Sequence, residues 1–346
     1  MRILIVRLGA LGDIVHAVPV AVALRHAYPD ATIDWLVSAK HREILDLVPV
    51  IDHRIVVADR KGASDGLSWP AAISALRRAK YDVAIDLQGL MKSAAAARFS
   101  GAQWVIGFSR NYAREPLASR FYTEVHDPGD SGIRSTGAVR HVVRVNLGIL
   151  AALGLTPGEP AFALEVKRSV AVEQVIAAAG GRYALLNTGA AWPNKRWPPA
   201  RLAALARELQ ARHALRSVVL WGPGERPLAD EVVSGAAGAA LHAPQTTIAD
   251  IAALAQAAAV MVSGDTGPTH IASAVGTPLV GIYGPTRPER NGPLGADDES
   301  VSRAGVCQCH HLRQCKLPRM CLLDIEVSEV LAAVERRLVA AERARG

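Results

Sequence analysis

The sequence predicts an α/β protein built from two doubly wound domains. Short runs of branched aliphatic residues alternate with longer stretches of helical character, and glycine-bearing turns follow several of these runs. Such runs are typical of strands buried in the middle of a parallel sheet. Near the middle of the chain the alternation stops at residues 154–160, which are rich in Gly and Pro. A length of 346 residues suits two domains of ordinary size.

The first half begins with a predicted strand at residues 1–6, followed by a glycine turn at residues 9–13 and a helix that extends through Ala27. This strand–turn–helix order, followed by another strand, is typical of a βαβ unit. The later elements expected in this half are strands at 32–37, 54–57 and 83–86 and a helix around 70–79. We therefore predict one doubly wound domain over residues 1–160.

The second half repeats the pattern after the turn-rich segment. The expected helices cover 170–179, 199–214 and 248–258, and the expected strands cover 183–187, 217–221, 260–263 and 278–283. We predict a second doubly wound domain over residues 161–325. Apolar residues at helical spacing then predict a closing helix within residues 326–346.

The charge favours anionic partners. Lys and Arg total 39 against 32 Asp and Glu, which gives a net charge of +7. A nucleic-acid-binding protein more often has a dense basic run with interleaved aromatic residues, but aromatics are only 5% of this chain. Phosphates or an acidic membrane surface are the expected partners. No apolar run reaches the length of a spanning helix, and the N-terminal run lacks the pattern of a signal peptide, so we expect a cytoplasmic protein.

The most informative segment is Gly264-Asp265-Thr266-Gly267-Pro268-Thr269-His270, between a predicted strand and a segment of helical character. A strand–turn–helix junction offers backbone N–H groups and the positive end of a helix dipole, which suit a phosphate. Thr266 is the expected N-cap. A capped βαβ connection without a ligand is the simpler interpretation. A helix cap, however, does not require the two further polar residues Asp265 and His270.

Two further loops carry polar residues after predicted strands. Gly9-x-x-Gly12-Asp13 is not the G-x-G-x-x-G of dinucleotide enzymes, and Asp13 there is either a helix cap or a base that takes a proton from a substrate hydroxyl. His16, one helical turn later, either orients this site or is an ordinary helix histidine. Lys195 and Arg196 either neutralise a diphosphate or form a solvated basic loop.

Five motifs together resemble the heptosyltransferases of glycosyltransferase family 9. They occur in the family's order along nearly the whole chain: R-L-G-A-L-G-D-I-V-H-A-V-P from Arg7, D-L-Q-G-L-M-K-S from Asp86, R-E-P-L-A-S-R-F-Y from Arg114, K-R-W-P from Lys195 and G-D-T-G-P-T-H from Gly264. The stretch that begins at Arg114 is most similar to the heptosyltransferase I branch.

The resemblance implies a GT-B fold, in which two Rossmann-like domains face each other and the C-terminal helix returns to pack on the N-terminal domain. It also implies an inverting enzyme that moves heptose from ADP-heptose to the Kdo of the lipopolysaccharide inner core without a cofactor or metal. The N-terminal domain would hold the acceptor and the C-terminal domain the donor. We expect peripheral contact with the inner face of the inner membrane of a Gram-negative bacterium, and no nucleic acid.

The resemblance also assigns roles to residues. Asp13 would be the general base. The implied donor-binding residues are Thr188, Lys195, Glu225, Asp265, Thr266, Gly267 and His270. The implied acceptor-binding residues are Gly12, Arg60, Lys61, Lys92 and Arg114.

The cysteines depart from the heptosyltransferase I pattern. Cys307, Cys309, Cys315 and Cys321 fall within 15 residues, beside two histidines. Their spacing differs from the usual zinc knuckles, so either a structural metal or thiols without a metal, some of them redox-sensitive, is expected. The other functions that remain open are a family 9 enzyme with another donor or acceptor, a GT-B-type sugar-nucleotide epimerase, and a zinc-bearing nucleic-acid-binding protein.

Overall fold

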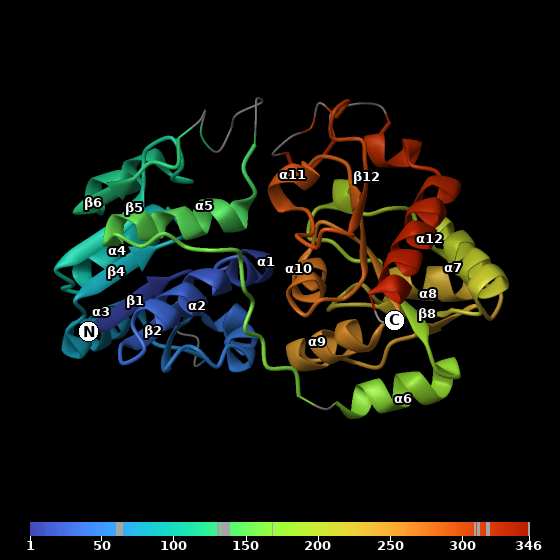
Figure 1. The fold of residues 1–346 in the computed structure, drawn as a ribbon, viewed down its shortest axis with the longest axis horizontal. Coiled ribbons are helices and arrows are strands. Elements are labelled where there is room, and N and C mark those ends of the chain that lie inside the picture. Colours follow the sequence, from blue (N-terminus) through green and yellow to red (C-terminus); the bar gives the residue numbers. More distant parts are fainter. Residues whose placement is uncertain are drawn as a thin grey trace. The chain divides into compact units, whose positions relative to one another are not determined.

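The computed structural model describes residues 1–59, 65–129, 132, 139–167, 169–307, 309, 312–315 and 319–344. The chain divides into two compact units, Met1–Glu165 and Val166–Gly346 (Figure 1). This division lies close to the expected boundary at residue 160. In the described part of the chain, no helix is both long and apolar enough to cross a bilayer.

The N-terminal unit contains a six-stranded parallel sheet in the order β3-β2-β1-β4-β5-β6. This is the strand order of doubly wound dinucleotide-binding folds. Its strands are β1 (Arg2–Val6), β2 (Thr32–Ser38), β3 (His53–Val57), β4 (Val83–Asp86), β5 (Trp104–Phe108) and β6 (Glu124–His126). The helices are α1 (Leu11–Val15), α2 (Val18–Ala27), α3 (Trp69–Ala79), α4 (Met91–Phe99) and α5 (Val142–Gly148), with 3₁₀ segments η1 (Ala39–Leu47), η2 (Pro116–Phe121) and η3 (Ile149–Leu153).

The predicted helix through Ala27 is interrupted. The structure has two helices, α1 and α2, and Pro19 stands in the first turn of the second. Proline lacks an N–H and its ring clashes with the carbonyl four residues earlier, so it fits a helix start and not a helix interior. The interruption leaves α1 as a short helix of five residues that contains Asp13.

The C-terminal unit has a second parallel sheet, in the order β12-β11-β10-β7-β8-β9. Counted from β7, this is the same doubly wound order as in the first unit. Its strands are β7 (Tyr183–Asn187), β8 (Arg216–Leu220), β9 (Ala240–His242), β10 (Val260–Gly264), β11 (Leu279–Tyr283) and β12 (Glu299–Ser302). The helices are α6 (Val170–Ala179), α7 (Pro199–His213), α8 (Arg226–Gly235), α9 (Ile248–Ala257), α10 (Gly267–Ala274), α11 (Pro288–Asn291) and α12 (Val327–Arg343), with η4 (Pro193–Lys195) and η5 (Cys321–Asp324).

Alternate residues of the second sheet are buried on its two faces. Ala184 and Leu186 of β7 pack with α7, α8 and α12, whereas Tyr183 and Leu185 pack with α6, α9 and α10. Successive side chains of a strand point to opposite faces, so a strand covered on both faces is apolar throughout. In the first unit, α3 and α4 cover one face of the sheet in the same way.

The closing helix α12 buries its apolar face, which includes Val330 and Val334, in the core of the C-terminal unit (Figure 1). It lies against α7 and against strands β11 and β12. The helical spacing showed that one face must be buried, but spacing alone does not say against which sheet.

Candidate active site

Most of the predicted site residues follow the four strands at the two topological switch points. In the first sheet the strand order reverses between β1 and β4, and in the second it reverses between β7 and β10. Loops that follow neighbouring strands at such a point diverge to opposite faces and leave a crevice, where open α/β sheets bind ligands. Asp13 follows β1, Lys195 follows β7 and Asp265 follows β10.

Asp13 is held by backbone and by two arginines. Its Oδ2 atom accepts a hydrogen bond from the N–H of Ala10 at 3.2 Å. The guanidinium of Arg7 lies 3.0 Å from the same oxygen, and that of Arg114 lies at 3.5 Å. Asp13 therefore has the contact expected of a helix cap, and its role as a base stays a prediction. It bonds the start of a helix, and it presents a half-buried carboxylate beside two cations.

The acceptor residues implied by the resemblance are only partly brought together. Gly12 neighbours Asp13 in α1, and Arg114 reaches Asp13 from the segment after β5. Lys92 is exposed in the first turn of α4. Arg60 and Lys61 lie outside the described residues.

Sequence reasoning did not identify two residues next to the Asp13 loop. The side-chain oxygen of Gln88, which follows β4, accepts hydrogen bonds from the backbone N–H groups of Leu8 and Gly9. The ring of His41 lies so close to Gly9 that a Cβ atom there would be 2.5 Å from its Cδ2. Both contacts join residues that are far apart in sequence, so no local sequence pattern predicts them. The family-like D-L-Q-G motif was the one available signal for Gln88.

In the C-terminal unit, Asp265 is a buried carboxylate between Lys195 and His270. Lys195 Nζ lies 2.5 Å from its Oδ2, and His270 Nε2 lies 3.1 Å from its Oδ1. Burial raises the pKa of Asp265, but the hydrogen bond to His270 and the charge of Lys195 outweigh it and hold this pKa well below its usual range. Lys195 also lies over the ring of Trp192, 4.6 Å from its centroid. The lysine is therefore positioned and not simply solvated.

The turn before α10 is built as predicted, with one difference. Thr266 stands at the N-cap position, but its side chain makes no cap hydrogen bond. Its hydroxyl instead bonds Asn187 Nδ2 at 2.9 Å and the hydroxyl of Thr269 at 3.0 Å. Asn187 also reaches Ser263 at 3.0 Å, so its amide links the ends of β7 and β10. The first N–H groups of α10, which begins at Gly267, have no carbonyl partner within the helix and can bind an anion.

Thr188 and Glu225 lie in adjoining loops of the C-terminal unit. The buried hydroxyl of Thr188 donates to the carbonyl of Leu220 at 3.3 Å. The carboxylate of Glu225 accepts from the N–H of Gly222 at 2.9 Å, and a Cβ at Gly189 would come within 2.0 Å of it. The glycine at position 189 therefore makes room for Glu225, which brings the two loops together.

The four cysteines gather in one cluster. Cys307, Cys309 and Cys321 are buried and Cys315 packs against them, and none of the four is in a disulfide. Cys309 and Cys315 have their sulfur atoms 3.0 Å apart, and the N–H of Cys309 donates to Cys307 Sγ. Burial, with a contribution from Cys307, raises the pKa of Cys321 to about 12. Within the described ranges, no three His, Cys, Asp or Glu side chains are arranged to hold a metal ion.

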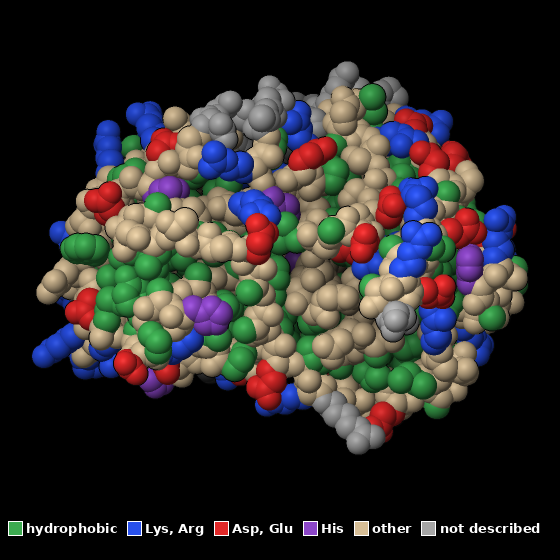
Figure 2. Space-filling view, viewed as in Figure 1, with side chains coloured by type: hydrophobic (Ala, Val, Ile, Leu, Met, Phe, Trp, Pro, Cys, Tyr) green, Lys and Arg blue, Asp and Glu red, His purple; other side chains and the backbone are tan. Residues whose placement is uncertain are grey.

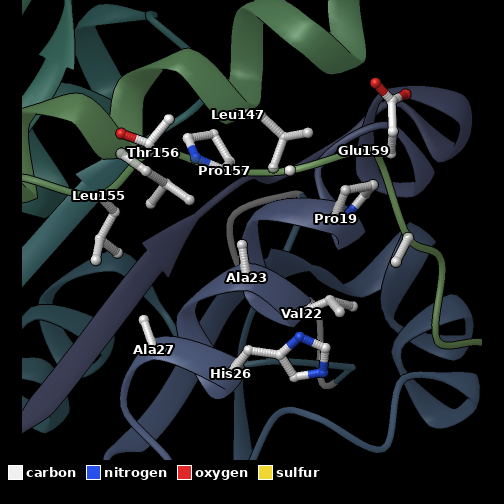
Figure 3. A pocket seen from close by; sticks show the side chains of 13 residues that line it. Pro19, Val22, Ala23, His26, Ala27, Leu147, Leu155, Thr156, Pro157 and Glu159 are labelled. Atoms are coloured by element: carbon white, nitrogen blue, oxygen red, sulfur yellow. The ribbon is translucent and has the colours of Figure 1, made fainter.

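A separate cavity of about 440 Å³ lies in the N-terminal unit between α2 and the segment that follows α5 (Figure 3). Its lining is mainly apolar, with His26 and Glu159 at its edges, and Figure 2 shows hydrophobic side chains gathered on this face of the unit. None of the predicted site residues lines it. The cavity is therefore distinct from the Asp13 loop.

Comparison with known proteins adds to this geometry. The family model for glycosyltransferase family 9 (heptosyltransferase) matches residues 69–320. Over 303 residues the chain is 32% identical to lipopolysaccharide heptosyltransferase 1 of Pseudomonas aeruginosa, an alignment that covers 85% of this chain and 82% of that protein. The solved structure of Escherichia coli heptosyltransferase WaaC with ADP is similar, with a TM-score of 0.76, 26% identity and coverage of 97% of this chain and 100% of that one. The structure of WaaC with ADP-2-deoxy-2-fluoro heptose is also similar, with a TM-score of 0.74 and 26% identity, and the match covers 97% of this chain and 99% of that one.

Proposed function

Because this chain belongs to glycosyltransferase family 9, it is an enzyme that transfers heptose in lipopolysaccharide core biosynthesis, and we propose that it moves this sugar from ADP-heptose to Kdo with inversion. The observation that supports this proposed donor, acceptor and stereochemistry is the set of residues at the two topological switch points. One presents the fixed carboxylate of Asp13, and the other presents Lys195 and the start of α10.

In the proposed reaction, Asp13 is the general base. Its carboxylate takes the proton of the acceptor hydroxyl, and the hydroxyl oxygen bonds to the anomeric carbon of the heptose. The bond between that carbon and the diphosphate oxygen breaks, and ADP leaves with the electron pair. The two arginines beside Asp13 favour its ionised form, which is the form that can accept a proton.

The negative charge that develops on ADP needs preorganised positive partners. The N–H groups at the start of α10 and the ammonium of Lys195 supply them in this proposal, with no metal ion. Asp265 and His270 act as positioning residues, because buried Asp265 bonds Lys195 and His270 in turn bonds Asp265. Thr188 and Glu225, whose loops adjoin at Gly189, are proposed to contact the nucleoside side of the donor, and Thr266 and Gly267 its phosphates.

The acceptor is anionic, and the proposal assigns its phosphate and carboxylate groups to cations of the N-terminal unit. Arg114 beside Asp13 is the best placed, and Lys92, Arg60 and Lys61 complete the proposed cations, while Gly12 is proposed to contact the acceptor beside the base. The net charge of +7 would also draw the enzyme to an acidic bilayer surface, so we propose peripheral contact at the cytoplasmic face of the inner membrane. We propose no nucleic-acid partner.

The test is heptose transfer from ADP-heptose to Kdo-bearing lipid A by wild type and by Asp13→Asn. We expect kcat to fall at least about a hundredfold in the variant, because an amide cannot take the proton. Asp30→Asn, which changes an exposed carboxylate of the same unit, is the matched control and should retain full activity. Asp13→Asn should still bind ADP, whereas Lys195→Met should weaken ADP binding.

Two further arms of the same experiment test the alternatives, which are a metal-bearing protein and a family 9 enzyme with another donor or acceptor. Activity should survive EDTA, and metal analysis of the purified protein tests whether the cysteine cluster carries a metal ion. Transfer that persists in Asp13→Asn would contradict the base assignment. A folded wild type that binds ADP but transfers no heptose would point to another donor sugar or acceptor within the family.

A further inference from the structure

The turn after β4, formed by Asp86, Leu87, Gln88 and Gly89, contacts the loop that carries Asp13. Gln88 Oε1 accepts from the N–H of Leu8 at 2.9 Å and from that of Gly9 at 3.3 Å. The carbonyl of Leu87 accepts a hydrogen bond from the guanidinium of Arg7, the same group that pairs with Asp13. One turn therefore holds both the backbone before Asp13 and the arginine beside it.

The turn itself is rigidly held. Asp86 is fully buried, and its carboxylate accepts from the N–H groups of Gln88 at 2.8 Å and Gly89 at 3.2 Å. The hydroxyls of Ser93 and Tyr122 donate to its other oxygen at 2.9 and 2.8 Å. Because both carboxylate oxygens of Asp86 accept hydrogen bonds, the backbone conformation of the turn and the orientation of the Gln88 side chain are fixed.

The same turn also holds the second partner of Asp13. Gly89 has a φ of +66°, and a Cβ there would lie 3.1 Å from the backbone of Ala113 and of Arg114. Its carbonyl accepts from the N–H of Glu115 at 2.9 Å. Glycine is therefore required at position 89 both for its backbone conformation and for the close approach of the Arg114 segment.

We propose that Gln88 is a positioning residue for catalysis, which sets the place of Asp13 through the N–H groups of Leu8 and Gly9. The proposal rests on the proposed role of Asp13 as the base. Gln88 is buried and touches backbone only in these contacts, so it acts through Asp13 and not on substrate. A neutral amide oxygen suits this place, because it accepts two N–H groups without adding a second negative charge near the base.

The test compares Gln88→Met with Gln88→Glu. Methionine is similar in length but removes the strong acceptor, so we expect kcat to fall about a hundredfold while the KM for ADP-heptose changes less than about twofold, since small displacements of a reacting group have effects of this size. Glutamate keeps the acceptor and should restore most of kcat. Its charge near Asp13 should move the acid limb of the kcat–pH profile to higher pH. Gln103→Met, at an exposed position of the same unit, is the control.

A double-mutant cycle with Asp13→Asn separates positioning from a general effect on folding. If Gln88 acts through Asp13, adding Gln88→Met to Asp13→Asn should lower the residual activity no further. An equal loss in both backgrounds would overturn the proposal, as would full activity of Gln88→Met. An active Asp13→Asn enzyme would instead overturn the proposed role of Asp13 as the base, so the two failures are distinguishable.

Discussion

At the scale of single residues, Gly9 is constrained from two sides. Its N–H bonds Gln88, and the ring of His41 occupies the space where a side chain would begin. Asp13 lies four residues further along, and its charge acts on His41, which places the histidine in the electrostatic surroundings of the proposed base. A substitution at Gly9 should therefore affect the reaction and not only local packing.

We predict that Gly9→Ala lowers kcat by about tenfold or more, because the new methyl group would lie 2.5 Å from His41 Cδ2 and must displace either the ring or the Asp13 loop. His41→Ala should restore most of the activity of Gly9→Ala, since it removes the ring. Steady-state kinetics of the two single variants and the double variant give the answer. Gly158→Ala, which meets nothing within 4 Å, is the control. A double variant no better than Gly9→Ala would show that the clash is not the cause.

The residues around Asp265 illustrate a second constraint at this scale. A buried carboxylate is costly unless it is paired, and here Lys195 and His270 pair it from two sides. The sequence indicated that all three residues belong near the donor. It did not indicate that they bond one another, because Lys195 and Asp265 are 70 residues apart and follow different strands.

At the scale of elements, both units use a side-chain amide to join the two loops at the switch point. Gln88 after β4 bonds the loop after β1, and Asn187 at the end of β7 bonds the turn after β10. In each unit the two strands are neighbours in the sheet although several elements separate them in the chain. An amide suits this position because it can donate and accept without a net charge.

Helix α12 packs in the core of the C-terminal unit, and its contribution to stability can be measured. Leu331 is 5% exposed in the C-terminal core, whereas Val339 on the same helix is 47% exposed. We predict that Leu331→Ala lowers the free energy of unfolding by about 2–5 kcal/mol, through lost burial and the cavity left behind. Val339→Ala should change it by less than about 0.5 kcal/mol. Hydrogen exchange of peptides from β11 and β12 should report the Leu331→Ala loss, and protection unchanged there would contradict the observed docking.

At the scale of the whole molecule, the two units share one strand order, and each carries its polar residues at the carboxyl ends of its central strands. Together with the similarity to WaaC, this confirms the predicted GT-B fold class. The repeated order has a common cause. Right-handed crossovers that start at a central strand and proceed outward, first to one side and then to the other, produce one switch point per sheet.

The pH dependence of stability belongs to the N-terminal unit as a whole. Burial lowers the pKa of His41 and of His126; Lys40 lowers that of His41 further, while Asp59 and Asp13 oppose the shift. In the unfolded chain both histidines should titrate near their ordinary pKa of about 6.5. Below that pH the unfolded state binds more protons than the folded state, so stability is fully present above about 6.5 and is lost as the pH falls through this value.

We therefore predict that the N-terminal unit is less stable at pH 5.5 than at pH 7.5. Hydrogen exchange in peptides of β1 and β4 over this range provides the measurement. The variant with both His41→Asn and His126→Asn should lose much of the dependence, since asparagine does not titrate. A dependence as steep in that variant as in wild type would assign it to other groups.

Sequence alone was sufficient for elements with strong local patterns. The predicted bounds of β4 and β7 agree with the structure, and the turn at Gly264–Gly267 lies between a strand and a helix as expected. Strands β5, β6, β9 and β12 were not predicted, and neither was α4, whose alanines have no marked apolar periodicity. Short, partly exposed strands and alanine-rich helices are stabilised by their neighbours in the fold more than by their own pattern.

The sequence by itself determined the α/β class, the two-domain organisation, the family and the loops in which Asp13, Lys195 and Asp265 lie, because periodicity, turn chemistry and motif order are local properties. Only the tertiary structure decided which loops are neighbours: Gln88 beside Gly9, Lys195 on Asp265, and α12 on the C-terminal sheet. The reason is the order of strands in each sheet. That order brings together segments about 70 to 80 residues apart, and no periodicity within a segment encodes it.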